Sequence, residues 1–168
     1  MLSQWNRLCL TTILFIVVVC STSNGFEAAN TPPAGASRVA AEVVELTNTE
    51  RGIHGREKLR ANARLMRAAQ VHAEQMARAR QQAHVLPNAA YPRAEDRLEA
   101  AGYNWQSFGE NLAFGQASPE EVVRSWMTSR SHRSNIVRAE FTELGVGYAI
   151  DGAGRPYYVQ VFANPLSS

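Results

Sequence analysis

The chain has 168 residues, of which 45% are hydrophobic and 8% aromatic, with 17 Lys and Arg against 15 Asp and Glu. This length suits one ordinary domain with a single core, and the hydrophobic fraction is too high for a disordered chain. A formal net charge of +2 gives no reason to expect nucleic acid or an anionic membrane as a partner.

The first 25 residues have the pattern of a secretory signal peptide. Arg7 supplies a positive charge, an apolar run extends from Leu8 to Cys20, and small polar residues follow. The run is shorter than the roughly 20 residues that a membrane-spanning helix needs. We expect cleavage after Ser23 or Gly25, with an uncleaved N-terminal anchor as the alternative.

Both cysteines, Cys9 and Cys20, lie within this segment. Lipid modification of Cys20 is disfavoured, because Val17–Val19 lacks the small residue that such processing prefers. The remaining chain has no cysteine and no Asn-x-Ser/Thr acceptor, which favours a bacterial exported protein. We expect a monomer that is secreted or held in the periplasm or cell envelope, with no stable transmembrane segment after cleavage.

Helical patterns fill the first part of the remaining chain. Residues 26–37 are rich in Ala and Pro, which predicts a flexible lead-in to a domain over 38–165. Apolar residues at helical spacing predict helices over 38–53, 63–81 and, as a short turn closed by Gly102, 92–101. Another helix starts at Ser118-Pro119-Glu120-Glu121, which combines an N-cap, a proline at the first helical position and a capping-box glutamate.

The C-terminal part changes to strands. Residues 144–150 and 157–162 are rich in β-branched and aromatic residues, and Asp151-Gly152-Ala153-Gly154 between them predicts a hairpin. Residues 108–114 read as a further strand. Because helices come first and the hairpin last, we predict an α+β domain in which helices cover a small antiparallel sheet.

Four histidines and one glutamate are the candidate reactive groups. His54 reads as a surface residue, and His72 lies on the apolar stripe of a helix, as a hydrogen-bonded structural histidine would. His84 and His132 lie in polar segments where a side chain could line a cleft, although composition alone favours plain surface positions. Glu110 stands in an apolar strand, so its carboxylate needs a partner, for which a histidine is suited.

An ordered set of short motifs resembles the CAP superfamily, or SCP-domain proteins, in its cysteine-free bacterial branch. The matching pieces, in chain order, are Leu46-x-Asn48-x-x-Arg51, Ala69-x-x-His72-Ala73-x-x-Met76-Ala77, His84, Gly109-Glu110-Asn111-Leu112-Ala113, Trp126-Met127-x-Ser129-x-x-His132-Arg133-x-Asn135-Ile136, Phe141-Thr142-x-Leu144-Gly145-Val146-Gly147 and Tyr158-Val159-Gln160-Val161-Phe162. The resemblance implies a three-layer α-β-α sandwich with a central cleft.

The resemblance also implies a cleft tetrad of two histidines and two glutamates. His84, Glu110 and His132 match three of its members, whereas Ser129 stands where many relatives have the second glutamate. Asn111 and Ser129 are expected in the same cleft. Two neutral imidazoles can still ligate zinc or another divalent cation while a carboxylate or water completes the shell.

Three functions remain open at this point. The first is a binding module for an extracellular or cell-envelope ligand, in which His84 and His132 hold the cation and Glu110 orients one of them. The second is a metal-assisted extracytoplasmic hydrolase with Glu110 as general base. The third is a sterol or fatty-acid carrier, because family members include lipid binders.

Two further groups of residues have both a structural and a functional interpretation. The first group is a basic stretch, for which a solvent-exposed face is the favoured interpretation and a binding site for an anionic cell-surface partner is the alternative. Its members are Arg51, Arg56, Lys58, Arg60, Arg64 and Arg67. Trp105, Phe108 and Phe114 could line an apolar groove for a lipid, but core packing is the favoured interpretation.

Overall fold

The computed structural model describes residues 34–166. The signal peptide predicted over 1–25 and most of the lead-in predicted over 26–37 lie outside these residues. The elements are α1 (Ala34–Ile53), β1 (Arg60–Ala61), α2 (Ala63–Ala79), α3 (Ala94–Ala100), β2 (Trp105–Phe114), α4 (Pro119–Thr128), α5 (Arg130–Ile136), β3 (Glu143–Ile150) and β4 (Pro156–Pro165). Within the described part no helix is both long and apolar enough to cross a membrane.

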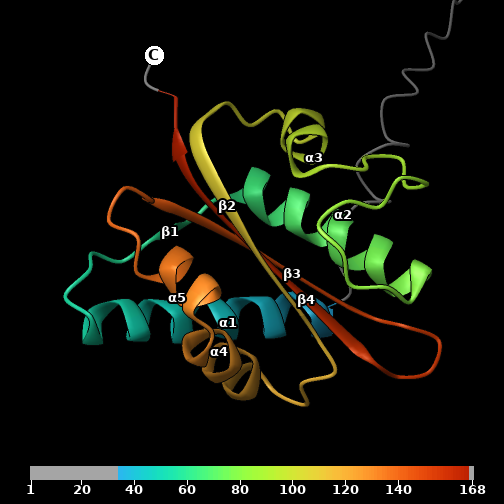
Figure 1. Ribbon diagram of the computed structural model, residues 1–168, viewed down its shortest axis with the longest axis horizontal. Coiled ribbons are helices and arrows are strands. Elements are labelled where there is room, and N and C mark those ends of the chain that lie inside the picture. Colours follow the sequence, from blue (N-terminus) through green and yellow to red (C-terminus); the bar gives the residue numbers. More distant parts are fainter. Residues whose placement is uncertain (1–33, 167–168) are drawn as a thin grey trace, which may run out of the picture. The chain divides into compact units, whose positions relative to one another are not determined.

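The four strands form one sheet in the order β1-β3-β4-β2, with β2 at an edge (Figure 1). The strands β3 and β4 form the predicted hairpin, and β2 pairs antiparallel with β4. The expectation of a purely antiparallel sheet is corrected by β1, a two-residue strand parallel to β3. Its two residues are too few to give a strand pattern in the sequence.

Helices cover both faces of the sheet, which confirms the α-β-α sandwich (Figure 1). On one face α2 and α3 pack over a core that includes Leu65, Met76, Leu98 and Val159. On the other face α1, α4 and α5 pack over a second core; its large members include Trp126, Ile136, Phe141 and Phe162.

Side-chain caps explain where the two central helices start. Asn62 precedes α2 and accepts hydrogen bonds from the backbone N–H groups of Arg64 and Leu65. Ser118 caps α4 as predicted, with Pro119 at the first helical position. The Glu121 carboxylate accepts instead from the N–H of Ala117, one residue before the cap. The side chains of Ser118 and Glu121 therefore supply hydrogen-bond acceptors for backbone N–H groups at the start of α4.

The helix α1 begins four residues earlier than predicted, and α5 was not predicted at all. Ala36 and Ala40 of α1 are buried, so the Ala-rich start of the helix contributes to the core. The α5 segment RSHRSNI has one buried residue, Ile136, and so lacks an apolar stripe.

Two glycines let α2 lie directly against β3. A Cβ atom on Gly145 would overlap the backbone of Leu65, and one on Gly147 would overlap the carbonyl of Ala69. Any side chain at these positions would push the helix away from the sheet. The spacing of α2 over the strands is therefore determined by the absence of two side chains.

Arg51 corrects the expectation of a uniformly solvated basic stretch. Its side chain is buried and donates hydrogen bonds to the carbonyl oxygens of Glu57, Ile136 and Arg138, at 2.7, 2.7 and 2.9 Å. It therefore joins the end of α1 to the segment after α5. The remaining basic residues of the stretch are exposed, as expected: Arg56, Lys58, Arg60, Arg64 and Arg67.

Trp105 and Phe108 are half-buried, meet edge to face at 5.7 Å between ring centroids and pack against the α2-side core. Phe114 is 42% exposed and stacks on the buried Tyr157. Core packing thus accounts for two of the three aromatic residues.

Candidate functional site

Glu110 lies in β2 on the face covered by α2, and both of its carboxylate oxygens have cationic or imidazole partners. Its side chain is only 5% exposed. Oε1 lies 2.8 Å from Nδ1 of His84, and Oε2 accepts from the Arg97 guanidinium at 2.8 Å. The structure therefore brings His84 and Glu110 together, as expected from the need of a buried carboxylate for partners.

Arg97 is the member of the site that sequence reasoning missed. Its side chain, from α3, is 1% exposed and also donates to the carbonyl oxygens of Tyr91 and Pro92, at 3.3 and 3.2 Å. It therefore neutralises Glu110 and holds the loop between α2 and α3 that carries His84. The segment AEDRLEA has the charge pattern of a surface helix, so no local signal marks this arginine as buried.

His84 contacts the protein through one ring nitrogen, and the other has no hydrogen-bond partner among the described residues. Nδ1 contacts Glu110, while the side chain as a whole is 61% exposed. The hydrogen bond to Glu110 raises the pKa of His84 above its ordinary value, against the opposing effect of partial burial. For Glu110, burial raises the pKa, but the hydrogen bond from His84 and the charge of Arg97 together leave it below its usual range.

His72 lies beneath this pair. Its ring is fully buried, with Nδ1 3.5 Å from Oε1 of Gln75 and Nε2 3.9 Å from Oε1 of Glu110. Among the residues that the structure describes, Nε2 has no hydrogen-bond partner. Burial lowers the pKa of His72 to about 4, so the ring is neutral near neutral pH. This histidine is therefore buried as predicted, but adjoins the site.

Asn111 points to the opposite face of the sheet, because successive residues of a strand alternate. Its side chain is completely buried. Its Nδ2 donates to the backbone carbonyl of His132 and to Oε1 of Gln160, both at 3.1 Å, and its Oδ1 accepts from Asn135 at 2.9 Å. We expected Asn111 in the cleft; its contacts instead position α5, which carries His132.

His132 lies in α5, and Ser129 is the residue just before this helix. His132 is half-buried in α5, where burial lowers its pKa and the nearby positive charge of His84 lowers it further. Ser129, at the junction of α4 and α5, is half-buried, with its hydroxyl 3.2 Å from that of Ser131. The segments that carry His84 and His132 therefore pack on opposite faces of the sheet.

The donors available to a cation are limited. Within residues 34–166 no group of three or more His, Cys, Asp or Glu side chains is placed to hold a metal ion. Glu110 is already engaged by His84 and Arg97. The site thus offers two imidazoles, that of His84, whose Nδ1 is held by a carboxylate, and that of His132.

The fold and these residues can be compared with known proteins. Residues 44–162 match the family described as CAP: Cysteine-rich secretory protein family. The chain belongs to this family.

Bacterial relatives resemble the CAP domain in sequence and in structure. The chain is 38% identical to the protein YkwD of Bacillus subtilis (strain 168) over 130 residues, 76% of this chain and 50% of YkwD. It is 32% identical to the membrane protein YlbC of the same organism over 121 residues, 72% of this chain and 33% of YlbC.

A solved structure confirms the fold. An extracellular protein containing an SCP domain from Bacillus anthracis str. Ames matches with a TM-score of 0.70 and 26% identity, covering 77% of this chain and 41% of that one. The CAP domain therefore spans half or less of the length of each of these three relatives.

Proposed function

We propose that this CAP domain acts as an exported binding module whose cleft holds a divalent cation, zinc in the first instance, through His84 and His132. One observation carries the proposal: Glu110 engages Nδ1 of His84 at 2.8 Å, and the side chain of His84 is 61% exposed, with no partner for Nε2 among the described residues. Metal-binding histidines commonly hold a carboxylate on the other ring nitrogen in this way. Zinc would supply Lewis acidity and an attachment point for a ligand.

The state of Glu110 favours an orienting role over that of a general base. Both of its oxygens are engaged, and its pKa is lowered by His84 and Arg97 in spite of burial. A carboxylate with a low pKa accepts a proton poorly near neutral pH but stays an anionic hydrogen-bond acceptor. This supports binding in preference to metal-assisted hydrolysis.

Calorimetric titration with zinc tests the proposal. At about pH 7.5 we expect micromolar or tighter binding, lost in a His84→Gln/His132→Gln double variant and weaker at about pH 5.5, because protons compete for the imidazoles. His54→Gln is the matched control, since His54 is exposed and lies outside the site. Equal affinities in the wild-type protein and the double variant would overturn the proposal.

A sharper version of the test changes only the orienting carboxylate. Glu110→Gln keeps the size of the side chain, and we expect zinc affinity to fall by about 10- to 100-fold, as is usual when such a partner is lost. A circular dichroism spectrum and melting curve would verify that the variant is folded. Unchanged affinity in a folded Glu110→Gln protein would remove Glu110 from the site.

The cellular location is part of the proposal. It is supported by the signal-like pattern of residues 1–25 and by the likeness to an extracellular relative. We expect the protein in the envelope or medium of the producing cell, and in the cytoplasm when those residues are deleted. Cell fractionation with an epitope tag would measure this.

A further inference from the structure

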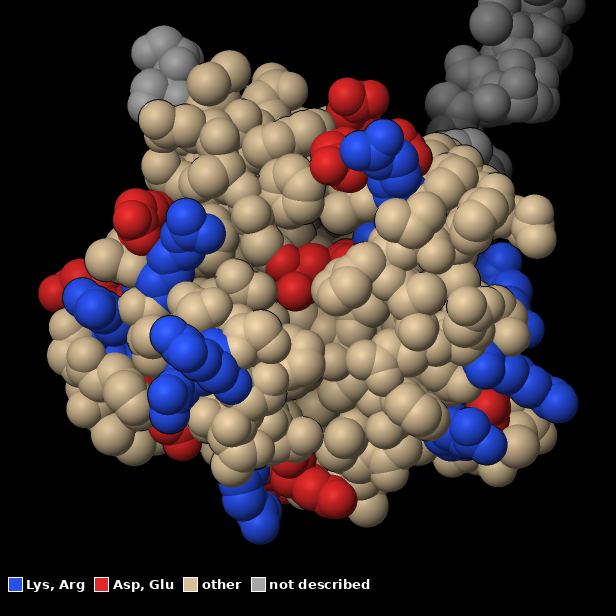
Figure 2. Space-filling view, viewed as in Figure 1, with Lys and Arg blue, Asp and Glu red and all other residues tan. Residues whose placement is uncertain are grey.

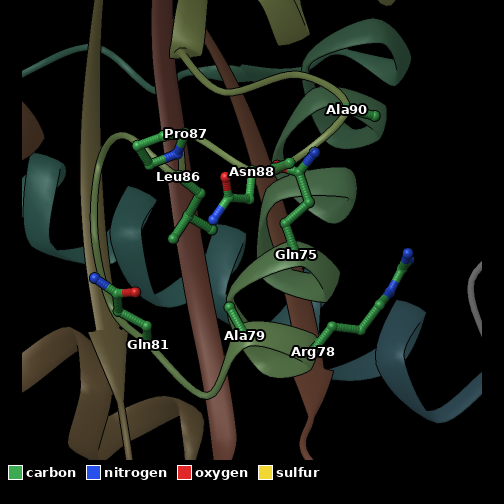
Figure 3. A pocket seen from close by; sticks show the side chains of 9 residues that line it. Gln75, Arg78, Ala79, Gln81, Leu86, Pro87, Asn88 and Ala90 are labelled. Atoms are coloured by element: carbon green, nitrogen blue, oxygen red, sulfur yellow. The ribbon is translucent and has the colours of Figure 1, made fainter.

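A second hollow lies beside the C-terminal half of α2, where the chain between α2 and α3 folds over the helix (Figure 3). Its volume is about 380 Å³. The residues that matter among those lining it are Gln75, Arg78, Ala79, Gln81, Leu86 and Asn88. None of the cleft residues His84, Glu110 and His132 lines it, so it is separate from the cation site.

The lining combines amide groups with a small apolar floor. Gln75, Gln81 and Asn88 each carry an amide that both donates and accepts hydrogen bonds. Figure 3 shows the amides of Gln75 and Asn88 close to one another over the hollow. Ala79 and the buried Leu86 supply the apolar surface. This pattern suits groups that themselves contain N–H and C=O beside small apolar side chains.

Arg78 adds one positive charge at the rim. Its side chain is 76% exposed, extends away from the hollow in Figure 3 and contacts Glu74 at 3.1 Å through one nitrogen. A guanidinium has five N–H donors, and this exposed side chain has to turn toward the hollow for its remaining donors to bind a carboxylate there. The volume lies at the small end of the roughly 300–1,000 Å³ typical of ligand pockets.

We propose that this hollow, called the α2 pocket, binds a short peptide through its C-terminal carboxylate. The amides of Gln75, Gln81 and Asn88 pair with peptide groups, the surface of Ala79 and Leu86 takes a small side chain such as a methyl group, and Arg78 takes the carboxylate. The inference does not depend on the proposed cation site.

The α2 pocket also contacts the core of the site through one shared side chain. Gln75 lines the pocket, and its Oε1 lies 3.5 Å from Nδ1 of His72. The other nitrogen of His72 lies 3.9 Å from Glu110. A peptide that hydrogen-bonds Gln75 therefore changes the surroundings of His72, one side chain away from Glu110.

Nuclear magnetic resonance titration with the dipeptide Ala-Ala tests the proposal. We expect saturable shifts confined to residues 75–90 and to the side chain of His72. Arg78→Ala should weaken binding by about tenfold, as expected for the loss of a charged hydrogen bond. Arg64→Ala is the matched control, because Arg64 is an exposed arginine of the same helix outside the pocket.

Three results would overturn the inference. The first is the absence of saturable shifts up to millimolar dipeptide. The second is equal binding of Ala-Ala and its C-terminal amide, or equal weakening by Arg78→Ala and Arg64→Ala, which would remove the carboxylate from the recognition. The third is a set of shifts centred on residues outside 75–90. Gln75→Leu provides a further check, because it should abolish the shift at His72.

Discussion

Glu110 and Asn111 are neighbours in β2 that point to opposite faces of the sheet, and each is bonded to one of the two candidate histidines or its backbone. On the α2 face Glu110 is an anion held by Arg97 and His84. On the other face Asn111 is a neutral amide bonded to Gln160, Asn135 and the backbone of His132, and Gln160 continues to Thr47 of α1 at 2.7 Å. Neighbouring residues of β2 thus belong to a charged cluster on one face of the sheet and to a neutral network on the other.

The difference between the two faces lies in what each one tolerates. A buried charge whose partner is removed is left without compensation, whereas a broken neutral hydrogen bond costs much less. The stability of the protein should therefore be sensitive to single changes on the α2 face and less sensitive to single changes on the α1 face.

Figure 2 shows that Lys and Arg surround the front face of the molecule, while its middle is mostly uncharged with a small acidic patch.

Removing Arg97 should have the largest effect. Arg97→Met keeps the length of the side chain but removes the cation from Oε2 of the buried Glu110 and leaves only His84 on Oε1, so we expect a loss of roughly 3–5 kcal/mol in the free energy of unfolding. Urea denaturation measures it. Adding Glu110→Gln to the same chain should restore much of the loss, because the remaining buried group is then neutral. A loss below about 1 kcal/mol for Arg97→Met would contradict a buried ion pair.

The pH dependence should be the next largest effect. Below about pH 6.5 the unfolded chain protonates His72, while the folded protein does not until about pH 4, so stability falls as the pH drops through this window. Over this whole pH range, His72 should lower the free energy of unfolding by roughly 3 kcal/mol. His84 has the opposite sign, because its raised pKa stabilises the fold at low pH and this contribution is lost as the pH rises.

Comparing the wild-type protein with His72→Gln separates these two contributions, since the variant keeps His84 and Glu110. Denaturation at about pH 7 and about pH 4.5 should show a smaller difference in the variant. The pKa of Glu110 lies below its ordinary value, so its contribution to stability is present near neutral pH and is lost only as the pH falls below the range compared here. An equal pH dependence in the two proteins would mean that His72 is not buried as described.

Breaking the neutral network should cost less. Asn111→Ala leaves Oε1 of Gln160 and the backbone carbonyl of His132 without the donor that Asn111 supplies, and we expect a loss of about 1–3 kcal/mol in the free energy of unfolding. Hydrogen exchange should become faster in α5 and stay unchanged in α3, because only α5 is held by Asn111. Faster exchange in both helices would show that the two faces do not behave independently.

The smallest effect on stability should come from His84→Gln. The side chain is 61% exposed, so the pair with Glu110 should contribute less than about 1 kcal/mol. The same variant should strongly weaken zinc binding. The loss of zinc affinity in calorimetry should therefore be larger for the His84 variant, whereas the loss of stability in denaturation should be larger for the Arg97 variant. A large loss of stability would place His84 among the structural members of the site.

The fold was predictable where the sequence carries local signals. Ser118-Pro119 marks the start of α4, and the turn at Asp151–Gly154 marks the hairpin, in which the Asp151 carboxylate accepts from the N–H groups of Ala153 and Arg155. The segment α5 and the strand β1 have no comparable signal. They form because the sheet edge and the buried Arg51 hold them, and those contacts connect distant parts of the chain.

The site was only partly predictable for the same reason. The lone acid in an apolar strand indicated that Glu110 needs a partner, and the family resemblance indicated His84. Nothing in the segment around Arg97 shows that its side chain is buried against a residue of another element. Strand alternation predicts that Asn111 and Glu110 point to opposite faces of the sheet. It does not predict which of these faces is covered by the end of a helix, and so it does not predict that Asn111 is buried.

The two glycines of β3 have a consequence for motion on long timescales. Because α2 lies on bare backbone at Gly145 and Gly147, the helix has no side-chain layer there that could rearrange locally. The amide protons of α2 near Leu65 and Ala69 should therefore exchange only when the whole domain unfolds. The chain that follows α2 and carries His84 has no such anchoring. This segment is held by hydrogen bonds from the Arg97 side chain, so its amide protons should exchange through smaller openings while the helix stays folded.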